Sequence, residues 1–441
     1  MVIDRRDVLE KAVHDLPNGW VWEWFTDVMD VDGGTQPPAS EFVDEPRPGY
    51  VRLVQIRDFE SDAYITYIPD SPKWRKCNAS DVLIARYGAS LGRVCTGLEG
   101  AYNVALAKIV PSARIHLPFA YYLLRSSYFQ GPLLAGGGRS AQAGFNKDGL
   151  SVIPLPIPPI SVQHAIAKIL RTLDGKIELN RRIAEILEAM ARALFRSWFS
   201  DFDPVRAKSD GSAVIVPARI AKLFPDRLDD SEMGRIPAGW ALGRLTDVLE
   251  QVRVHENPLT SPDALFTHYS IPAFDEGLGP KLETGGKIKS TKLRVPSDVV
   301  LLSKLNPEIE RVWLVDVKEG EHAVCSTEFM VLRALPPFTT SYVYCLIRSP
   351  ILRQHLEALV TGTSNSHQRA QADSVLALQV VLPPYSIVKA FDAAASHLLR
   401  RALACRRESH TLRGVRDTLL PRLISGELAV NTGAVTVQAD V

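Results

Sequence analysis

The sequence lacks the features of an exported, disulfide-bonded or membrane-spanning protein. Its 441 residues include only five cysteines, which are scattered and form no CxxC pair, so a disulfide framework and a zinc site are both disfavoured. No apolar run is long enough to span a bilayer, and residues 1–10 are charged where a secretory signal would be apolar. We therefore expect a cytoplasmic protein with reduced thiols, no membrane partner and no metal of its own.

Motifs for catalysis are missing as well. The Gly-rich segment Gly136–Ser140 lacks the Walker spacing of an ATP site, and Leu382–Tyr385 (LPPY) lacks the Asn or Asp that begins the adenine-methyltransferase tetrapeptide. Asp298, Asp316 and Lys318 are residue types that a nuclease uses, but such trios arise often by chance among 50 acidic and 51 basic residues. The sequence thus predicts a chain that is not an enzyme and binds no cofactor.

What the chain does have is an internal repeat. The segment LPNGW at 16–20 matches IPAGW at 236–240, and TDV at 26–28 recurs at 246–248. A second repeated segment, at an offset of 225 positions, lies at the end of each half. Two similar units imply two similar sites, which suit a long, regular partner better than a small molecule.

Each half begins with a mixed, strand-rich block. Val51–Ile56 alternates like a half-buried strand, and Asp81–Ala85 is an apolar burst that also indicates a strand. Leu117–Leu124 is richer in helix formers, and Gly136–Ser140 has the composition of a flexible loop. The prolines of Val152–Ile160 exclude a helix there and predict an extended segment.

Each block is followed by a long amphipathic helix whose apolar residues recur at alternating spacings of three and four. These stretches are basic: Gln163–Phe199 has seven Lys/Arg against four Asp/Glu, and Val388–Leu428 has eight against four. Each helix could pack on its own block, but a helix of roughly 37 residues, about 55 Å long, is long for one domain face, so pairing of the two helices is the better explanation.

Asn180 interrupts the first apolar seam and could fix its register. The apolar residues expected at the helix pair or a subunit interface are Ile166, Leu170, Leu173, Ile177, Leu187, Leu194, Trp198, Phe391, Leu398, Leu412, Leu419 and Leu423.

Four local signatures carry a resemblance to a known family. They are the paired openings LPNGW and IPAGW, the Gly-rich loop and Pro-rich strand followed by Gln163, the segment LFRSWFSDFDP at 194–204, and DTLLPRLISGEL at 417–428. Together they resemble the specificity subunits of type I restriction–modification systems over most of the chain. The second half departs from the pattern, because Val388 stands at the place of Gln163 and because Asn365 and His367 replace the Gly-rich character of the first loop.

The resemblance implies an α+β fold with two repeated target-recognition domains, each followed by a long helix, and with the two helices pairing as an antiparallel coiled coil. The expected boundaries are 1–158 for the first recognition domain, 159–202 for its helix, 203–235 for a linker, 236–382 for the second domain, 383–428 for its helix and 429–441 for a flexible tail.

The resemblance also implies a function. Each domain would read one half of a bipartite sequence in double-stranded DNA, while the helices set the spacing and dock the modification (M) and restriction (R) subunits. S-adenosylmethionine, ATP and Mg would then bind the partner subunits. The alternative is a coiled-coil scaffold without sequence-specific DNA binding.

Loops rich in Arg, Lys, Asn, Gln, Ser and Thr are the candidates for DNA contact, because these side chains read base edges and bind phosphates. For any single residue, ordinary solvated surface is the alternative interpretation. The candidates in the first block are Arg86, Tyr87, Ser90, Arg93, Arg139, Ser140, Gln142, Asn146 and Lys147. Those in the second are Ser303, Lys304, Asn306, Thr363, Ser364, Asn365, His367, Gln368 and Arg369.

Overall fold

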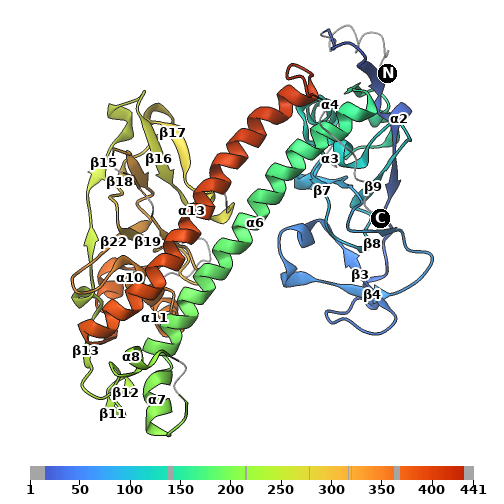
Figure 1. The fold of residues 1–441 in the computed structure, drawn as a ribbon. Helices are drawn as coiled ribbons and strands as arrows, with labels where there is room; N and C mark the ends of the chain where they lie inside the picture. The colour runs from blue at the N-terminus through green and yellow to red at the C-terminus, as the bar shows by residue number, and fades with distance from the viewer. Residues whose placement is uncertain are drawn as a thin grey trace. The chain divides into compact units, whose positions relative to one another are not determined.

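The computed structural model describes residues 15–137, 144–213, 216–277, 279–315, 317–318, 320–361 and 368–431. The chain divides into two compact units, one formed by Met1–Gly175 with Leu412–Val441 and the other by Lys176–Thr411. Each unit therefore contains a part of both long helices (Figure 1). No helix within the described ranges is long and apolar enough to cross a membrane.

Two four-stranded sheets form the first unit. One is antiparallel with strand order β2-β9-β6-β7, and the other has the order β4-β3-β8-β5, in which β3 and β8 are parallel. A further antiparallel pair joins β1 to β10. The strands are β1 Val21–Trp24, β2 Met29–Gly33, β3 Tyr50–Val54, β4 Tyr67–Pro69, β5 Lys76–Cys77, β6 Leu83–Ala85, β7 Val94–Cys95, β8 Gly100–Tyr102, β9 Leu106–Pro111 and β10 Pro154–Ile157. The helices are α2 Phe25–Val28, α3 Leu117–Arg125, α4 Ser127–Gly137 and α5 Lys147–Leu150.

The side-chain alternation of β6 explains how this unit is layered. Leu83 and Ala85 lie in a buried cluster with Val54 and Tyr102 of the second sheet, whereas Ile84 belongs to the cluster that contains the buried faces of α3 and α4. Because successive side chains of a strand point to opposite faces, one apolar strand supplies both cores. The strands and the helix expected near residues 51–56, 81–85 and 117–124 are confirmed as β3, β6 and α3.

The second unit repeats this arrangement. Its antiparallel sheet has the order β14-β22-β19-β20, its second sheet is β15-β18-β21-β16-β17 with β16 and β21 parallel, and β13 pairs with β25. Alternate residues of β19 again face two cores. The strands are β13 Ala241–Arg244, β14 Leu249–Val252, β15 His255–Glu256, β16 Leu265–Tyr269, β17 Lys281–Thr284, β18 Lys292–Arg294, β19 Val299–Ser303, β20 Val312–Leu314, β21 Ala323–Cys325, β22 Phe329–Ala334, β23 Val360–Thr361, β24 Arg369–Ala370 and β25 Gln379–Leu382. The helices are α9 Ile271–Asp275, α10 Thr340–Ile347, α11 Pro350–Ala358 and α12 Ala372–Leu376.

Two segments differ from the sequence-based description. The stretch expected to be a linker contains α7 (Asp203–Ser209), α8 (Ala218–Ala221) and the hairpin β11 (Leu228–Ser231) and β12 (Gly234–Pro237). Its apolar residues, including Val205 and Phe224, are buried in the second unit's core, which is why it folds. In the expected Gly-rich loop, Gly136 and Gly137 instead end α4, while 138–143 and the tail beyond 431 lie outside the described residues.

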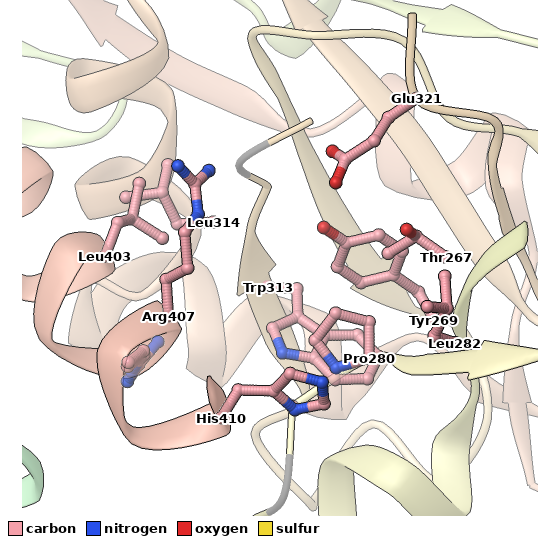
Figure 2. A pocket seen from close by; sticks show the side chains of 12 residues that line it. Thr267, Tyr269, Pro280, Leu282, Trp313, Leu314, Glu321, Leu403, Arg407 and His410 are labelled. Carbon is pink, nitrogen blue, oxygen red and sulfur yellow. The ribbon is translucent and has the colours of Figure 1, made fainter. Parts of the chain in front are cut away.

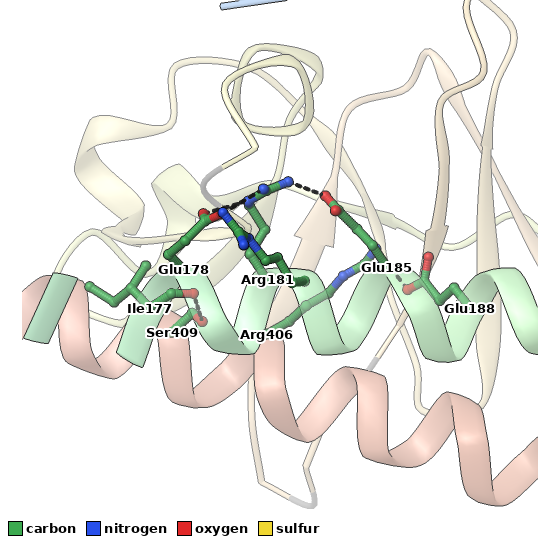
Figure 3. Close-up of polar contacts among 8 residues, drawn as sticks. Ile177, Glu178, Arg181, Glu185, Glu188, Arg406 and Ser409 are labelled. Carbon is green, nitrogen blue, oxygen red and sulfur yellow. Dashed lines mark hydrogen bonds and ion pairs between the residues drawn. The ribbon is translucent and has the colours of Figure 1, made fainter. Parts of the chain in front are cut away.

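The two long helices, α6 (Ile160–Phe199) and α13 (Tyr385–Ile424), contain 40 residues each. Contacts within both units show that they pair antiparallel. In the first unit Arg416 binds Asp174, and in the second the Ser409 hydroxyl donates to the carbonyl of Ile177 (Figure 3). Further along the second unit, Phe195 packs against Phe391, so residue numbers rise in one helix as they fall in the other. The expected antiparallel pairing is confirmed.

The buried face of α6 drifts away from a strict heptad. Leu187 and Leu194 are only half-buried, while Glu188 and Phe195 are 4% and 2% exposed. An α-helix has 3.6 residues per turn, so an apolar stripe with a 3.5-residue period rotates slowly around it. Of the expected interface residues, Ile166, Leu170, Ile177, Trp198, Phe391 and Leu423 are buried, and Leu173, Leu187, Leu194, Leu398, Leu412 and Leu419 are half-buried.

Candidate nucleic-acid interface

In the first unit, the loop after β6 meets the segment before α5. Tyr87 forms an isolated antiparallel bridge with Gly144, which brings two segments of the predicted set together although they are far apart in the sequence. The guanidinium of Arg86 lies 5.1 Å from the ring centroid of Tyr87, which is 43% exposed. An exposed aromatic ring beside an arginine offers both a planar surface and a positive charge to a partner.

The other described candidates of this unit make contacts within the chain. Asn146 caps α5 by accepting a hydrogen bond from the backbone N–H of Gly149 at 2.8 Å. Lys147 lies with its Nζ 2.8 Å from a carboxylate oxygen of Asp30, and the hydrogen bond lowers the pKa of that carboxyl. Arg93 forms an ion pair with Glu60, and Ser90 ends a short 3-10 turn. The remaining candidates Arg139, Ser140 and Gln142 lie outside the described residues.

The second unit has the equivalent arrangement after β19. Leu305 forms an isolated antiparallel bridge with Arg369, at the place where Tyr87 bridges Gly144 in the first unit. The backbone N–H of Asn306 donates to the carbonyl of Gln368 at 2.9 Å, and Asn306 has a left-handed φ of 48°. The structure therefore unites the two predicted loops in each half, by the same kind of backbone contact.

Arg369, one of the basic residues in these two loops of the second unit, is held by an ion pair. Arg369 binds Glu328 through two hydrogen bonds, from Nε at 3.0 Å and from an Nη at 2.8 Å, and this fixes the plane of its guanidinium. Ser303 is 5% exposed and its hydroxyl is engaged with the backbone of Leu305, which leaves it poorly placed to reach a base. Lys304 donates its backbone N–H to the carbonyl of Glu328. Thr363, Ser364, Asn365 and His367 lie outside the described residues.

Sequence reasoning missed the carboxylates that accompany these cations. Glu60, Asp30 and Glu328 are each distant in sequence from the basic residue that they bind. Nothing in the local sequence of Glu328 marks it as a partner of Arg369. The contact arises because β24 is brought beside the loop after β19, which residue spacing does not reveal.

The described residues offer little for covalent or metal chemistry. They include no group of three or more His, Cys, Asp or Glu side chains placed to hold a metal ion. All five cysteines are buried, and burial raises the pKa of the Cys77 and Cys95 thiols to about 11, which opposes formation of a nucleophilic thiolate.

A separate pocket of about 240 Å³ lies in the second unit between its larger sheet and α13 (Figure 2). Trp313 and Tyr269 pack edge to face in its wall, with ring centroids 5.0 Å apart. Arg407 and His410 enter from α13, while Glu321 approaches from the side of the sheet. None of the residues that line this pocket is among the predicted DNA contacts, so it is distinct from the paired loops.

Comparison with known proteins identifies the family that this architecture resembles. Residues 17–189 match the family model of the type I restriction modification DNA specificity domain. The predicted resemblance to type I specificity subunits is confirmed. The type I restriction enzyme HindI specificity subunit of Haemophilus influenzae is 27% identical over 376 residues, which cover 73% of this chain and 79% of that protein.

One further relative and one solved structure match almost the whole length of the chain. The type I restriction enzyme MjaIX specificity subunit of Methanocaldococcus jannaschii is 23% identical over 447 residues, covering 96% of each protein. The crystal structure of the type I restriction-modification S subunit from M. genitalium superposes with a TM-score of 0.59 at 13% identity, covering 94% of this chain and 97% of that one. At that identity the superposition shows a shared fold.

Proposed function

We propose that this chain is the DNA-recognition subunit of a type I restriction–modification complex. The observation that carries the proposal is the repeated loop contact, Tyr87 with Gly144 and Leu305 with Arg369, at the end of equivalent central strands. Each unit thus presents one composite loop surface with exposed polar and basic side chains. Two such surfaces, joined to one antiparallel helix pair, suit a target with two half-sites.

In this proposal each recognition unit reads one half-site, and α6 with α13 set the number of unread base pairs between them. The M and R subunits dock on the chain in the cytoplasm and supply the chemistry. S-adenosylmethionine, ATP and Mg bind those partners, while this chain contributes sequence recognition and is not itself a catalyst.

The function is tested with the assembled complex of this chain and its M subunits. Methylation of a random DNA library, read out by sequencing, is expected to yield one bipartite motif with a fixed gap. A methylated motif of contiguous bases contradicts the proposal. A complex that assembles but shows no sequence preference supports the alternative of a coiled-coil scaffold.

The spacing role has its own test. Inserting one turn of about four residues into both α6 and α13 adds roughly 5 Å, so the gap is expected to lengthen by one or two base pairs. The matched control inserts the same residues into the turn between β11 and β12, where the gap should stay the same. An unchanged gap after the helix insertion contradicts the spacing role.

A further inference from the structure

In the first unit, a tyrosine of the recognition domain is hydrogen-bonded to the long helices. Tyr122 on α3 is 1% exposed, and its hydroxyl donates to a carboxylate oxygen of Asp174 on α6 at 2.8 Å. Arg416 on α13 donates to the other oxygen of Asp174, also at 2.8 Å. One carboxylate therefore connects the recognition domain with both helices.

The second unit contains a corresponding contact. Tyr344 on α10 is fully buried, and its hydroxyl donates to Glu188 on α6 at 3.0 Å. Arg406 on α13 lies 2.7 Å from the other oxygen of Glu188 (Figure 3). Arg348, the residue that follows α10, adds a hydrogen bond to the same carboxylate at 3.1 Å. We call each set of tyrosine, carboxylate and α13 arginine a junction.

The two junctions are alike in structure but are not copies of one another in sequence. Tyr122 and Tyr344 lie on corresponding helices of the two units, which the repeat explains. The carboxylates do not follow the repeat, because the positions 225 residues after Asp174 and Glu188 hold Leu399 and Arg413. Both units therefore achieve the same three-part contact with a different residue on α6.

Breaking the hydrogen bonds of either junction should be energetically unfavourable. Burial raises the pKa of the Tyr122 and Tyr344 hydroxyls, and the neighbouring carboxylate raises it further, so both phenols stay protonated as donors. Glu188 is 4% exposed, and a buried carboxylate that loses a partner keeps the penalty of its removal from water, whereas the half-buried Asp174 keeps a smaller part of it. Hydrogen bonds also weaken steeply with angle, so rotation of a recognition domain on the helices weakens the hydrogen bond of its tyrosine.

We propose that these two junctions fix the angle of each recognition domain on the helix pair, and that Tyr122, Tyr344, Asp174 and Glu188 are thereby positioning residues for gap-length specificity. The inference rests on the proposed function, since gap length has meaning only for a bipartite target. Without a junction, a domain can rotate enough to reach a half-site that is displaced by a base pair.

The test replaces Tyr344 or Tyr122 by Phe, singly and together, because Phe keeps the ring and removes only the hydroxyl. In the complex with M subunits, methylation is measured on DNA with the native gap and with gaps one base pair shorter and longer. A hydrogen bond to a charged group is worth about tenfold or more in an equilibrium, so we expect discrimination against the altered gaps to fall about tenfold in each single variant. The double variant should lose more.

Two matched controls separate positioning from general stability. Glu178→Gln removes a carboxylate from the same helix, but Glu178 pairs with Arg181 and Arg182 inside α6 (Figure 3). Tyr342→Phe removes a buried hydroxyl from α10 that bonds to no other described residue. Both controls should keep the gap discrimination of the unaltered chain.

The outcomes separate the two proposals. If the junction variants melt at a lower temperature yet discriminate between gaps as the unaltered chain does, the junctions only stabilise the fold and the inference is overturned. If a tyrosine variant fails to assemble with the M subunits, gap discrimination is measured with Glu188→Gln instead, because Gln keeps the shape of the side chain. If the unaltered chain itself shows no dependence on gap length, the proposed function fails instead.

Discussion

The side-chain amide of Asn180 on α6 donates a hydrogen bond to Glu408 on α13, with 2.9 Å between Nδ2 and Oε2. Asn180 is fully buried, and its Oδ1 has no hydrogen-bond partner among the described residues. The amide also lowers the pKa of the Glu408 carboxyl. A buried polar side chain that is satisfied in only one alignment favours that alignment at some cost in stability.

Replacement of Asn180 by Leu should therefore stabilise the chain while loosening its register. We expect the free energy of unfolding to rise by about 1 kcal/mol, because an unsatisfied buried oxygen is removed. Urea unfolding measures this change. Register is followed by oxidative cross-linking of Ala184→Cys to the native Cys405, which pack in one cluster. A fall in stability with unchanged cross-linking would show that Asn180 is simply a stabilising residue.

The aromatic cluster where α6 meets the start of α13 should be a main source of the second unit's stability. Phe391 is fully buried, with ring centroids 5.7 Å from Phe195 and 5.3 Å from Phe199. Phe391→Ala should lower the free energy of unfolding by about 3–5 kcal/mol, since it leaves a large cavity. Tyr385→Ala on the same helix, where the side chain is 57% exposed, is the control and should have little effect. A loss below about 1 kcal/mol for Phe391→Ala would mean that the cluster can collapse around the gap.

Local patterns in the sequence predict elements well because they depend on neighbouring residues. The apolar burst at Asp81–Ala85 predicts β6, and the three-four spacing predicts both long helices. The inner face of α6 is less predictable, since Glu188 is buried in place of Leu187. Its partners Tyr344, Arg348 and Arg406, which are distant in the sequence, make that burial possible.

Long-range pairing is the part that the sequence does not reveal. The parallel pairing of β3 with β8 places Leu53 opposite Ala101, which is distant in the sequence, and no local motif encodes it. The same holds at the candidate interface. Composition predicts that Arg369 lies in a polar loop, but its ion pair with Glu328 follows from the placement of β24.

The stability of the first unit should depend on His116 in mildly acidic solution. Its ring stacks on His164 with centroids 3.8 Å apart, and burial, aided by nearby positive charge, lowers the pKa of His116 from 6.5 to about 4. The unfolded chain therefore binds this proton near pH 6.5, whereas the folded chain resists it until about pH 4. The contribution of His116 to the free energy of unfolding is fully present above pH 6.5 and is lost progressively as the pH falls to 4.

His116→Gln should remove this pH-dependent contribution to the free energy of unfolding. Between pH 6.5 and 4 the unaltered chain should lose about 1–2 kcal/mol more than the variant, a figure below the full pKa difference because the side chain is partly exposed. Urea unfolding at several pH values measures the difference, and His255→Gln at an exposed position is the control. Parallel stability curves for the variant and the unaltered chain would contradict this assignment.

The two arginines of the loop pairs differ in how the chain holds them, and both should contribute to DNA binding. Arg86 makes no ion pair within the described ranges, whereas Arg369 is held by Glu328. In the assembled complex, Arg86→Ala and Arg369→Ala should each weaken site-specific binding by about 1–3 kcal/mol if the side chain reads a base. If either arginine binds only a phosphate, its loss should instead weaken binding to all sequences and reduce the salt dependence.

Replacement of Glu328 by Gln separates the roles further. It removes a negative charge near the loop, so binding to random DNA should tighten, especially at low salt. It also leaves one acceptor oxygen in place of two, so one of the two hydrogen bonds that orient Arg369 is lost and the preference for the specific site over random DNA should fall. Gel-shift titrations at several salt concentrations measure both quantities, with Arg114→Ala, an exposed arginine paired with Glu23 outside the loops, as the control. If Glu328→Gln tightens specific and random binding equally, the ion pair does not orient Arg369 for base recognition.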